Sequence, residues 1–266
     1  MGLSQLAYPD RTLLATLSGG SWNAGLPLAN IQNPLISKVA RTTDALAASS
    51  TIIVDLGAQY PVQMCAILGH NLTIAATIRF RGYTDVGMTV LAQDSGGSAW
   101  PASYTATAAA AAPTNTIRPL GTATARYWKV EIVDTANPAG YIQLGRVWIG
   151  PSWIPAVGVA YGADIMYDPR SISEESLGGV LWFDLRAPRR KGTISFPALT
   201  PIERRTAILL QRNLSNSGEL IYVEDSTAAP EDMLLFSFPA TMEMINPIKA
   251  AYFQGHELPI GLLENI

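Results

Sequence analysis

The feature that most constrains this chain is a succession of short apolar runs, each bounded by turn-forming residues. Residues 126–133 (RYWKVEIV) show the pattern best, because Trp128, Val130 and Ile132 alternate with side chains suited to solvent. Successive side chains of a β-strand point to opposite faces, so this alternation predicts a strand with one face in a core. The chain is therefore expected to be mostly β.

Comparable runs lie on both sides of a turn-rich break near residue 150. Strands are expected at 51–56, 64–68, 77–83, 88–92, 126–133, 141–149, 179–185, 193–196, 220–223, 233–238 and 250–253. No helix-length segment separates the first six, which predicts an antiparallel jelly-roll β-sandwich. The alanine-rich residues 104–112 are interpreted as a loop or a loose strand.

The break itself is Gly150-Pro151, a pair of residues that punctuates regular structure. It predicts two domains. Residues 1–150 form the jelly roll with an N-terminal extension, and residues 151–266 form a smaller β-rich α+β domain.

One helix is expected in the second domain, near residues 201–214. Its start, Thr200-Pro201-Ile202-Glu203, has the form of a capping box with proline at the first helical position. The stripe expected to face the core consists of Ile202, Thr206, Leu209 and Leu210.

Charge is sparse in this chain. Lys and Arg together number 18 and Asp and Glu 21, so charged residues are 15% of the chain, against about 25% in ordinary soluble proteins. With 48% apolar residues the composition excludes intrinsic disorder, and the net charge of −3 argues against nucleic acid as a partner. The densest basic cluster, Arg186 with residues 189–191, is interpreted as a solvated turn. Low charge also suits a protein that buries surface against neighbours.

Residue types that carry catalysis or bind metals are scarce. The chain has two histidines, His70 and His256, and one cysteine, Cys65. No nucleophile elbow, phosphate-binding loop or zinc-protease motif is present, so no catalytic, cofactor-binding or metal-binding residue is predicted and the protein is not expected to be an enzyme. A cell-wall hydrolase stays the weakest alternative. His70 is expected to be a hydrogen-bonded structural residue and Cys65 a buried one, as in a protein folded in a reducing cytosol.

Five residues are candidates for an interface or a glycan contact. Trp22, Trp100 and Trp153 lie in loop or boundary contexts, where an aromatic side chain is available for contact. Arg79 and Arg81 share one face of an expected strand, and arginine is enriched at protein interfaces. The sequence shows no signal-peptide pattern and no apolar run long enough to span a membrane.

The order of three segments carries a family resemblance. TIIVDLG at residues 51–57, SGGSAW at 95–100 and ARYWKVEIVD at 125–134 together resemble the galactose-binding-like, or discoidin-like, jelly roll over residues 20–150. More narrowly, NAGLPLANI at 23–31, ILGHNLTIAATIRFRGY at 67–83 and the segment from 125 to 150 resemble tail proteins of long-tailed bacteriophages and prophages.

The narrower resemblance implies a function. It implies a structural component of a phage tail tip or baseplate, a distal or minor tail protein that assembles as a homo-oligomeric ring around the tail axis. Tail tube, hub and fibre proteins are the implied partners, and the virion is the implied location, after folding in the host cytoplasm. A contribution to host adsorption fits this role. The alternative is a carbohydrate-binding module that recognises host cell-surface glycans. Neither hypothesis requires a cofactor.

Overall fold

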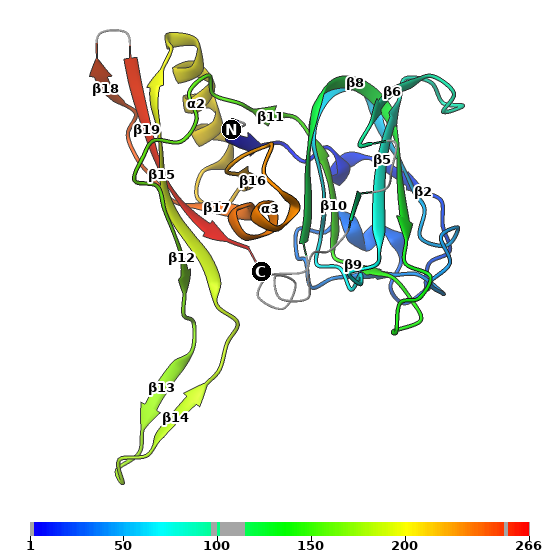
Figure 1. Cartoon of the computed structure of the whole chain (residues 1–266), viewed down its shortest axis with the longest axis horizontal. Coiled ribbons are helices and arrows are strands. Elements are labelled where there is room, and N and C mark those ends of the chain that lie inside the picture. The colour runs from blue at the N-terminus through cyan, green and yellow to red at the C-terminus, as the bar shows by residue number, and fades with distance from the viewer. Residues whose placement is uncertain (1–2, 97–99, 102–114, 253–254, 266) are drawn as a thin grey trace. The chain divides into compact units, whose positions relative to one another are not determined.

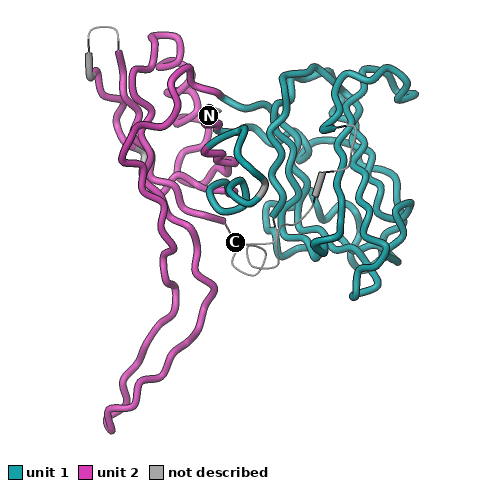
Figure 2. The backbone as a smooth tube through the Cα atoms, in the orientation of Figure 1, with its two compact units in different colours: residues 1–2, 6–153, 225–237 teal, residues 3–5, 154–224, 238–266 magenta. Residues whose placement is uncertain are grey.

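A computed structural model describes residues 3–96, 100–101, 115–252 and 255–265. The chain divides into two compact units (Figure 2): unit 1 contains residues 1–2, 6–153 and 225–237, and unit 2 contains residues 3–5, 154–224 and 238–266. The division after residue 153 lies close to the expected break, but residues 225–237 return to unit 1. Residues 104–112 lie outside the described residues.

The expected fold class is confirmed, because the described chain is mostly β and its sheets are antiparallel. The strands up to residue 153 are β1 (Gln5–Ala7), β2 (Thr16–Ser18), β3 (Ala40–Arg41), β4 (Ile52–Leu68), β5 (Thr77–Tyr83), β6 (Leu91–Asp94), β7 (Trp100–Pro101), β8 (Asn115–Val133), β9 (Gln143–Leu144), β10 (Arg146–Gly150) and β11 (Ser152–Trp153). The helices of unit 1 are η1 (Thr12–Leu14), η2 (Leu28–Gln32) and α3 (Pro230–Phe236).

Two long strands organise unit 1. Its main sheet has the order β10-β4-β8-β5-β6, with β2 paired to β4 and β7 paired to β5. The pairing of β4 with β8 shifts register between Asp55 and Tyr60, and Gly57 adopts a φ of 80° there, a conformation that glycine adopts readily. The runs expected at 51–56 and 64–68 are therefore the two halves of one strand with an irregularity between them.

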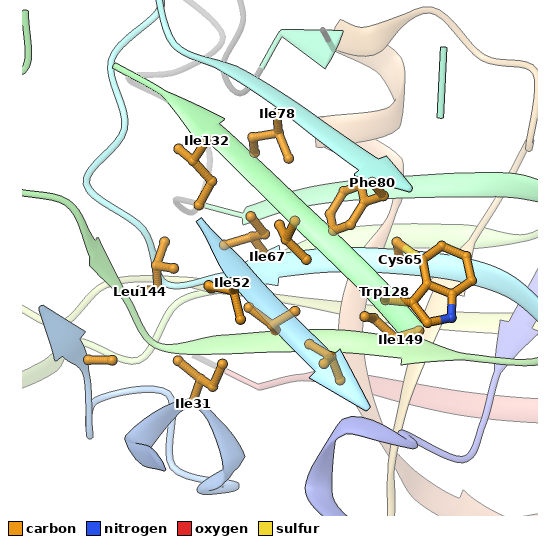
Figure 3. Packing of buried hydrophobic residues seen from close by; sticks show 14 of the residues in the cluster. Ile31, Ile52, Cys65, Ile67, Ile78, Phe80, Trp128, Ile132, Leu144 and Ile149 are labelled. Carbon is orange, nitrogen blue, oxygen red and sulfur yellow. The ribbon is translucent and has the colours of Figure 1, made fainter. Parts of the chain in front are cut away.

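The core of unit 1 lies on the inner face of these strands (Figure 3). Trp128, Val130 and Ile132 are fully buried, whereas Tyr127, Lys129 and Glu131 are only half-buried, which confirms the predicted alternation. Opposite Trp128 on the neighbouring strand stands Gly82. A Cβ atom at Gly82 would lie 2.9 Å from Cζ2 of Trp128, so the indole occupies the space that a larger residue would take.

A buried ion pair ties the N-terminal segment of unit 1 to β10. Arg146 donates from Nε to Oδ2 of Asp10 at 3.0 Å and from Nη2 at 2.9 Å, and both side chains are almost completely buried. Burial raises the pKa of Asp10, against the opposing effect of Arg146. Cys65 is buried in the same core, as predicted, and burial raises the pKa of its thiol well above the usual value.

Unit 2 is built around one antiparallel sheet and one α-helix in its described residues. Its elements are β12 (Asp164–Asp168), β13 (Ile172–Glu175), β14 (Leu181–Asp184), β15 (Arg189–Leu199), α2 (Pro201–Leu214), β16 (Glu219–Val223), β17 (Phe238–Ile245), β18 (Lys249–Tyr252) and β19 (Gly255–Glu264). Within this unit the strands of the sheet follow the order β16-β17-β19-β15-β12, with β18 paired to β19. The strands β13 and β14 pair only with each other among the described residues.

The basic cluster at 186–191 was expected to be a solvated turn, and the structure corrects this expectation for Arg190. Arg190 is buried in β15, where its guanidinium pairs with Glu264 and lies 4.8 Å from the ring centroid of Phe238. The cause is the register of the sheet, which directs this side chain inward while its neighbours Arg189 and Lys191 reach Asp168 and Glu243 at the surface.

The helix α2 begins as predicted. Thr200 Oγ1 accepts a hydrogen bond from the Glu203 amide, and the Glu203 carboxylate accepts one from the Thr200 amide at 2.8 Å. The predicted inner stripe, however, is correct only for Leu210, which is buried. The side chains that face the sheet are Ala207, Leu210 and Leu214, whereas Ile202, Thr206 and Leu209 are exposed. Both stripes satisfy helical spacing, and the helix packs on the one that contains the small Ala207.

The strand expected at 233–238 is also wrong over most of its length. Residues 230–236 form α3, with Pro230 in its first turn together with Glu231 and Asp232. Proline at a helix start and acidic side chains near the positive end of the helix dipole favour this conformation. Only at Phe238 does a strand, β17, begin.

Candidate functional site

Trp22 is anchored rather than freely displayed. It forms an isolated bridge with Thr42, and its indole Nε1 donates to the Gly19 carbonyl at 2.9 Å. The side chain is half-buried and packs against the core of unit 1. A glycan could contact only the part of the ring that remains exposed.

Arg79 and Arg81 share the outer face of β5, as predicted, and both are held in ion pairs. Arg79 donates from Nη2 to Oδ2 of Asp94 at 2.6 Å and from Nε to Oδ1 at 3.1 Å, and these bonds lower the pKa of Asp94. Arg81 Nη2 lies 2.6 Å from Oε1 of Glu131, which Lys129 also contacts at 3.0 Å. The two arginines are thus tied to neighbouring strands, and this outer face is a mixed-charge ladder.

The other two tryptophans lie on short strands rather than in loops. Trp100 is in β7, opposite Ile78 of β5, and its side chain lies outside the described part of the molecule. Trp153 is half-buried in β11, opposite Leu6 of β1. The structure therefore does not gather the five predicted residues into one site.

The most exposed apolar surface lies elsewhere, in residues 169–188, a segment we call the arm. Every arm residue is exposed, and the hairpin β13–β14 extends away from the rest of unit 2 (Figures 1 and 2). Exposed fractions reach 112% for Leu177, 82% for Leu185 and 68% for Trp182. The arm carries seven of the 24 exposed large apolar side chains of the described residues: Ile172, Leu177, Val180, Leu181, Trp182, Phe183 and Leu185.

An isolated two-stranded hairpin is marginally stable in water, and soluble monomers rarely expose apolar surface of this kind. The arm therefore has the properties of a surface that another molecule covers. Sequence reasoning identified 179–185 as a strand but not as a contact surface. The run VLWFDL after Gly178-Gly179 is a hairpin signal, yet nothing local distinguishes a covered strand from an exposed one.

A second, smaller group of residues lies in unit 1. Arg41 of β3 lies opposite Gln143 of β9, and its Nη2 donates to Oε1 of Gln143 at 2.9 Å. The same guanidinium stacks over Tyr141, 4.1 Å from the ring centroid, and its buried Nε has no hydrogen-bond partner in the described residues. Asn71 donates to the Tyr141 carbonyl. Planar polar groups beside an aromatic ring are the kind of surface that binds sugars.

The described residues show neither a metal site nor a membrane-spanning helix. Among the described residues, no three His, Cys, Asp or Glu side chains are grouped as a metal ion would require. His70 is buried and hydrogen-bonded to Thr116, as predicted. No helix in the described ranges has the length and apolar character needed to cross a membrane.

Comparison with known proteins gives likenesses to solved structures only. No family model and no curated protein matches the chain. Similar structures include the lectin domain of lectinolysin complexed with Lewis B antigen, at 16% identity and a TM-score of 0.41, covering 55% of this chain and 98% of that one. A fucose-binding module of Streptococcus pneumoniae has 14% identity and a TM-score of 0.40, covering 53% and 94%. A chitosan-binding module from a Paenibacillus sp. IK-5 chitosanase/glucanase has 13% identity and a TM-score of 0.39, covering 54% and 100%.

Proposed function

We propose that this chain is a structural assembly protein whose copies join through the arm into a homo-oligomer. The observation that carries the proposal is the exposure of all arm residues, with Trp182, Phe183 and Leu185 among them. Covering such side chains removes apolar area from water at roughly 25 cal/mol per Å², which favours association through the arm. No catalytic role is assigned.

Within this proposal, the resemblance of the sequence to tail proteins of long-tailed bacteriophages suggests a place for the assembly. We propose the tail tip or baseplate of a virion, with tail tube, hub and fibre proteins as further partners. Purified virions should then contain this polypeptide in a fixed ratio to the tube protein by quantitative mass spectrometry. Its absence from purified tails would refute the placement but not the oligomer.

The experiment that tests the assembly compares masses in solution. An arm-shortened variant, with a Gly-Ser pair in place of residues 171–186, should be monomeric by light scattering where the wild-type chain is oligomeric. Because no arm residue is buried, the variant should still fold and should unfold cooperatively on heating, as circular dichroism would show. Leu14→Ser, which removes an exposed leucine from unit 1, is the matched control and should assemble normally. A wild-type chain that stays monomeric across the micromolar range refutes the proposal.

A second candidate function is glycan binding by unit 1, and the observation that favours it is the group formed by Arg41, Tyr141 and Gln143. The test is a glycan array probed with the wild-type chain and with Arg41→Ala. Arg126→Ala serves as the control, because Arg126 also stacks on a tyrosine and pairs with a polar partner but lies on β8. Signals that Arg41→Ala abolishes and Arg126→Ala retains would support this function, and a blank array would contradict it.

A further inference from the structure

The outward face of α2 is a second exposed surface with apolar side chains, and its charge is opposite in sign to that of the arm's hairpin. Ile202, Ile208 and Leu209 are exposed there, although aliphatic side chains at helical spacing ordinarily pack inward. Arg205 and Arg212 follow the same outward stripe, and Arg204 lies beside it. The guanidinium groups of these three arginines form no ion pair within the described ranges. The face is therefore basic and aliphatic.

The hairpin of the arm is acidic and apolar. From Ile172 to Asp184 it contains three acids and no lysine or arginine. Glu174 stands opposite Trp182 and Glu175 opposite Leu181, so each acid has an apolar side chain beside it on its own face of the hairpin. Neither glutamate has an ion-pair partner in the part of the chain that the structure describes. Asp184 pairs with Arg186 at 2.6 Å, so among the described residues the unpaired charge of the hairpin is that of Glu174 and Glu175, and the unpaired charge of the helix face is that of its three arginines.

The arm cannot reach α2 of its own chain. β15 connects the two, with the arm before Arg189 and α2 after Leu199. At about 3.3 Å per residue, the eleven residues of β15 put roughly 35 Å between the end of the arm and the start of α2. Figure 1 shows the hairpin and the helix at opposite ends of β15, with the hairpin pointing away. Contact between the two surfaces therefore requires a second molecule.

We propose that the arm of one copy docks on the outward face of α2 of a second copy. This inference rests on the proposed assembly function and adds the surface on which the arm docks. Opposite charges select the orientation, and the apolar side chains between them supply the buried area. Because the arm and α2 are different patches, one such contact leaves a free helix on the first copy and a free arm on the second. Reciprocal exchange of arms closes a two-fold dimer, and repetition in one direction generates a ring or a filament.

Charge reversal tests the pairing directly. Variant H carries Arg205→Glu and Arg212→Glu on the helix, and variant A carries Glu174→Lys and Glu175→Lys on the arm. All four positions are exposed, so both variants should fold. Each alone should weaken self-association at least about tenfold in sedimentation equilibrium, because like charges then oppose each other at the interface. A chain that carries both changes should recover most of the wild-type association. Lys38→Glu, at an exposed lysine of unit 1, is the matched control and should change nothing.

The outcomes separate this inference from the proposed function. If the arm-shortened variant is monomeric while variant H assembles like the wild type, the arm docks elsewhere, so the inference fails and the assembly function stands. Loss of assembly in variant H without recovery in the combined chain also overturns the direct pairing. A monomeric wild-type chain overturns both. Recovery of self-association in the combined chain supports the inference, because reversing both sets of charges restores the attraction only if the two surfaces contact each other.

Discussion

Protonation of His70 should destabilise unit 1 as the pH falls, and the structure sets the size of the effect. The ring is buried, with Nε2 2.9 Å from Oγ1 of Thr116, and Nδ1 accepts the Leu72 amide at 3.3 Å. An Nδ1 that accepts carries no proton, so the neutral ring holds its proton on Nε2. A second proton on Nδ1 would face an N–H donor in an environment that also disfavours charge.

Burial lowers the pKa of His70 from 6.5 to about 4, although the Asp134 carboxylate acts in the opposite direction. The unfolded chain therefore binds a proton at a higher pH than the folded chain. The stabilising contribution of the neutral ring is complete above pH 6.5 and is lost progressively as the pH falls towards 4. At 1.36 kcal/mol per pKa unit, the difference between these two values corresponds to about 3 kcal/mol.

Urea unfolding followed by tryptophan fluorescence measures this loss, with His70→Gln as the reference because glutamine can still donate to Thr116 and does not titrate. Acidic groups contribute equally to both proteins, so they cancel in the difference between the two free energies of unfolding. We expect that difference to shift by about 3 kcal/mol in favour of the variant between about pH 7.5 and pH 4. A difference that stays constant over this range would refute the reasoning.

Three further changes test the packing. Arg146→Met should lower the free energy of unfolding in urea by about 3–5 kcal/mol, because it leaves the buried Asp10 carboxylate without its ion-pair partner. Adding Asp10→Leu should recover most of the loss, and an Arg146→Met variant as stable as the wild type would contradict this. Gly82→Ala should cost about 1–3 kcal/mol by crowding Trp128, whereas Gly121→Ala, with nothing within 4 Å of the new Cβ, should be tolerated, and equal losses would remove the explanation. Thr200→Ala should lower the free energy of unfolding by about 1 kcal/mol, measured by thermal unfolding, and Thr200→Ser should lower it much less. A Thr200→Ala variant as stable as the wild type would show that the capping box contributes nothing.

Local patterns predicted those parts of the fold that depend on near neighbours in sequence. The alternation over 126–133 specifies which side chains of β8 are buried, because the two faces of a strand are set by backbone geometry alone. The capping box at Thr200 similarly places the start of α2, since its partners are three residues apart. The strand expected at 233–238 failed because an apolar run of that length fits either a strand or a helix, and the local signals of a helix start, Pro230 with Glu231 and Asp232, precede the run.

Local sequence patterns did not predict which distant segments pair with each other. The sequence placed Arg79 and Arg81 on one face, but their partners Asp94 and Glu131 come from β6 and β8, which only the sheet register brings alongside. Arg190 likewise becomes a buried residue through Glu264, more than seventy residues away. Ion pairs of this kind depend on strand order, and strand order is a property of the whole sheet.

By itself, then, the sequence determined a mostly β chain with one capped helix in its second half, few charges and a core of alternating strands. The tertiary structure alone decided which apolar side chains remain outside. Trp182 in the arm and Leu209 on α2 are apolar side chains at the spacing of core residues, and they are exposed because no other described element packs against them. Burial is a relation between segments, so it is settled only when the segments are placed in space, and here that placement leaves the arm and the outward face of α2 exposed.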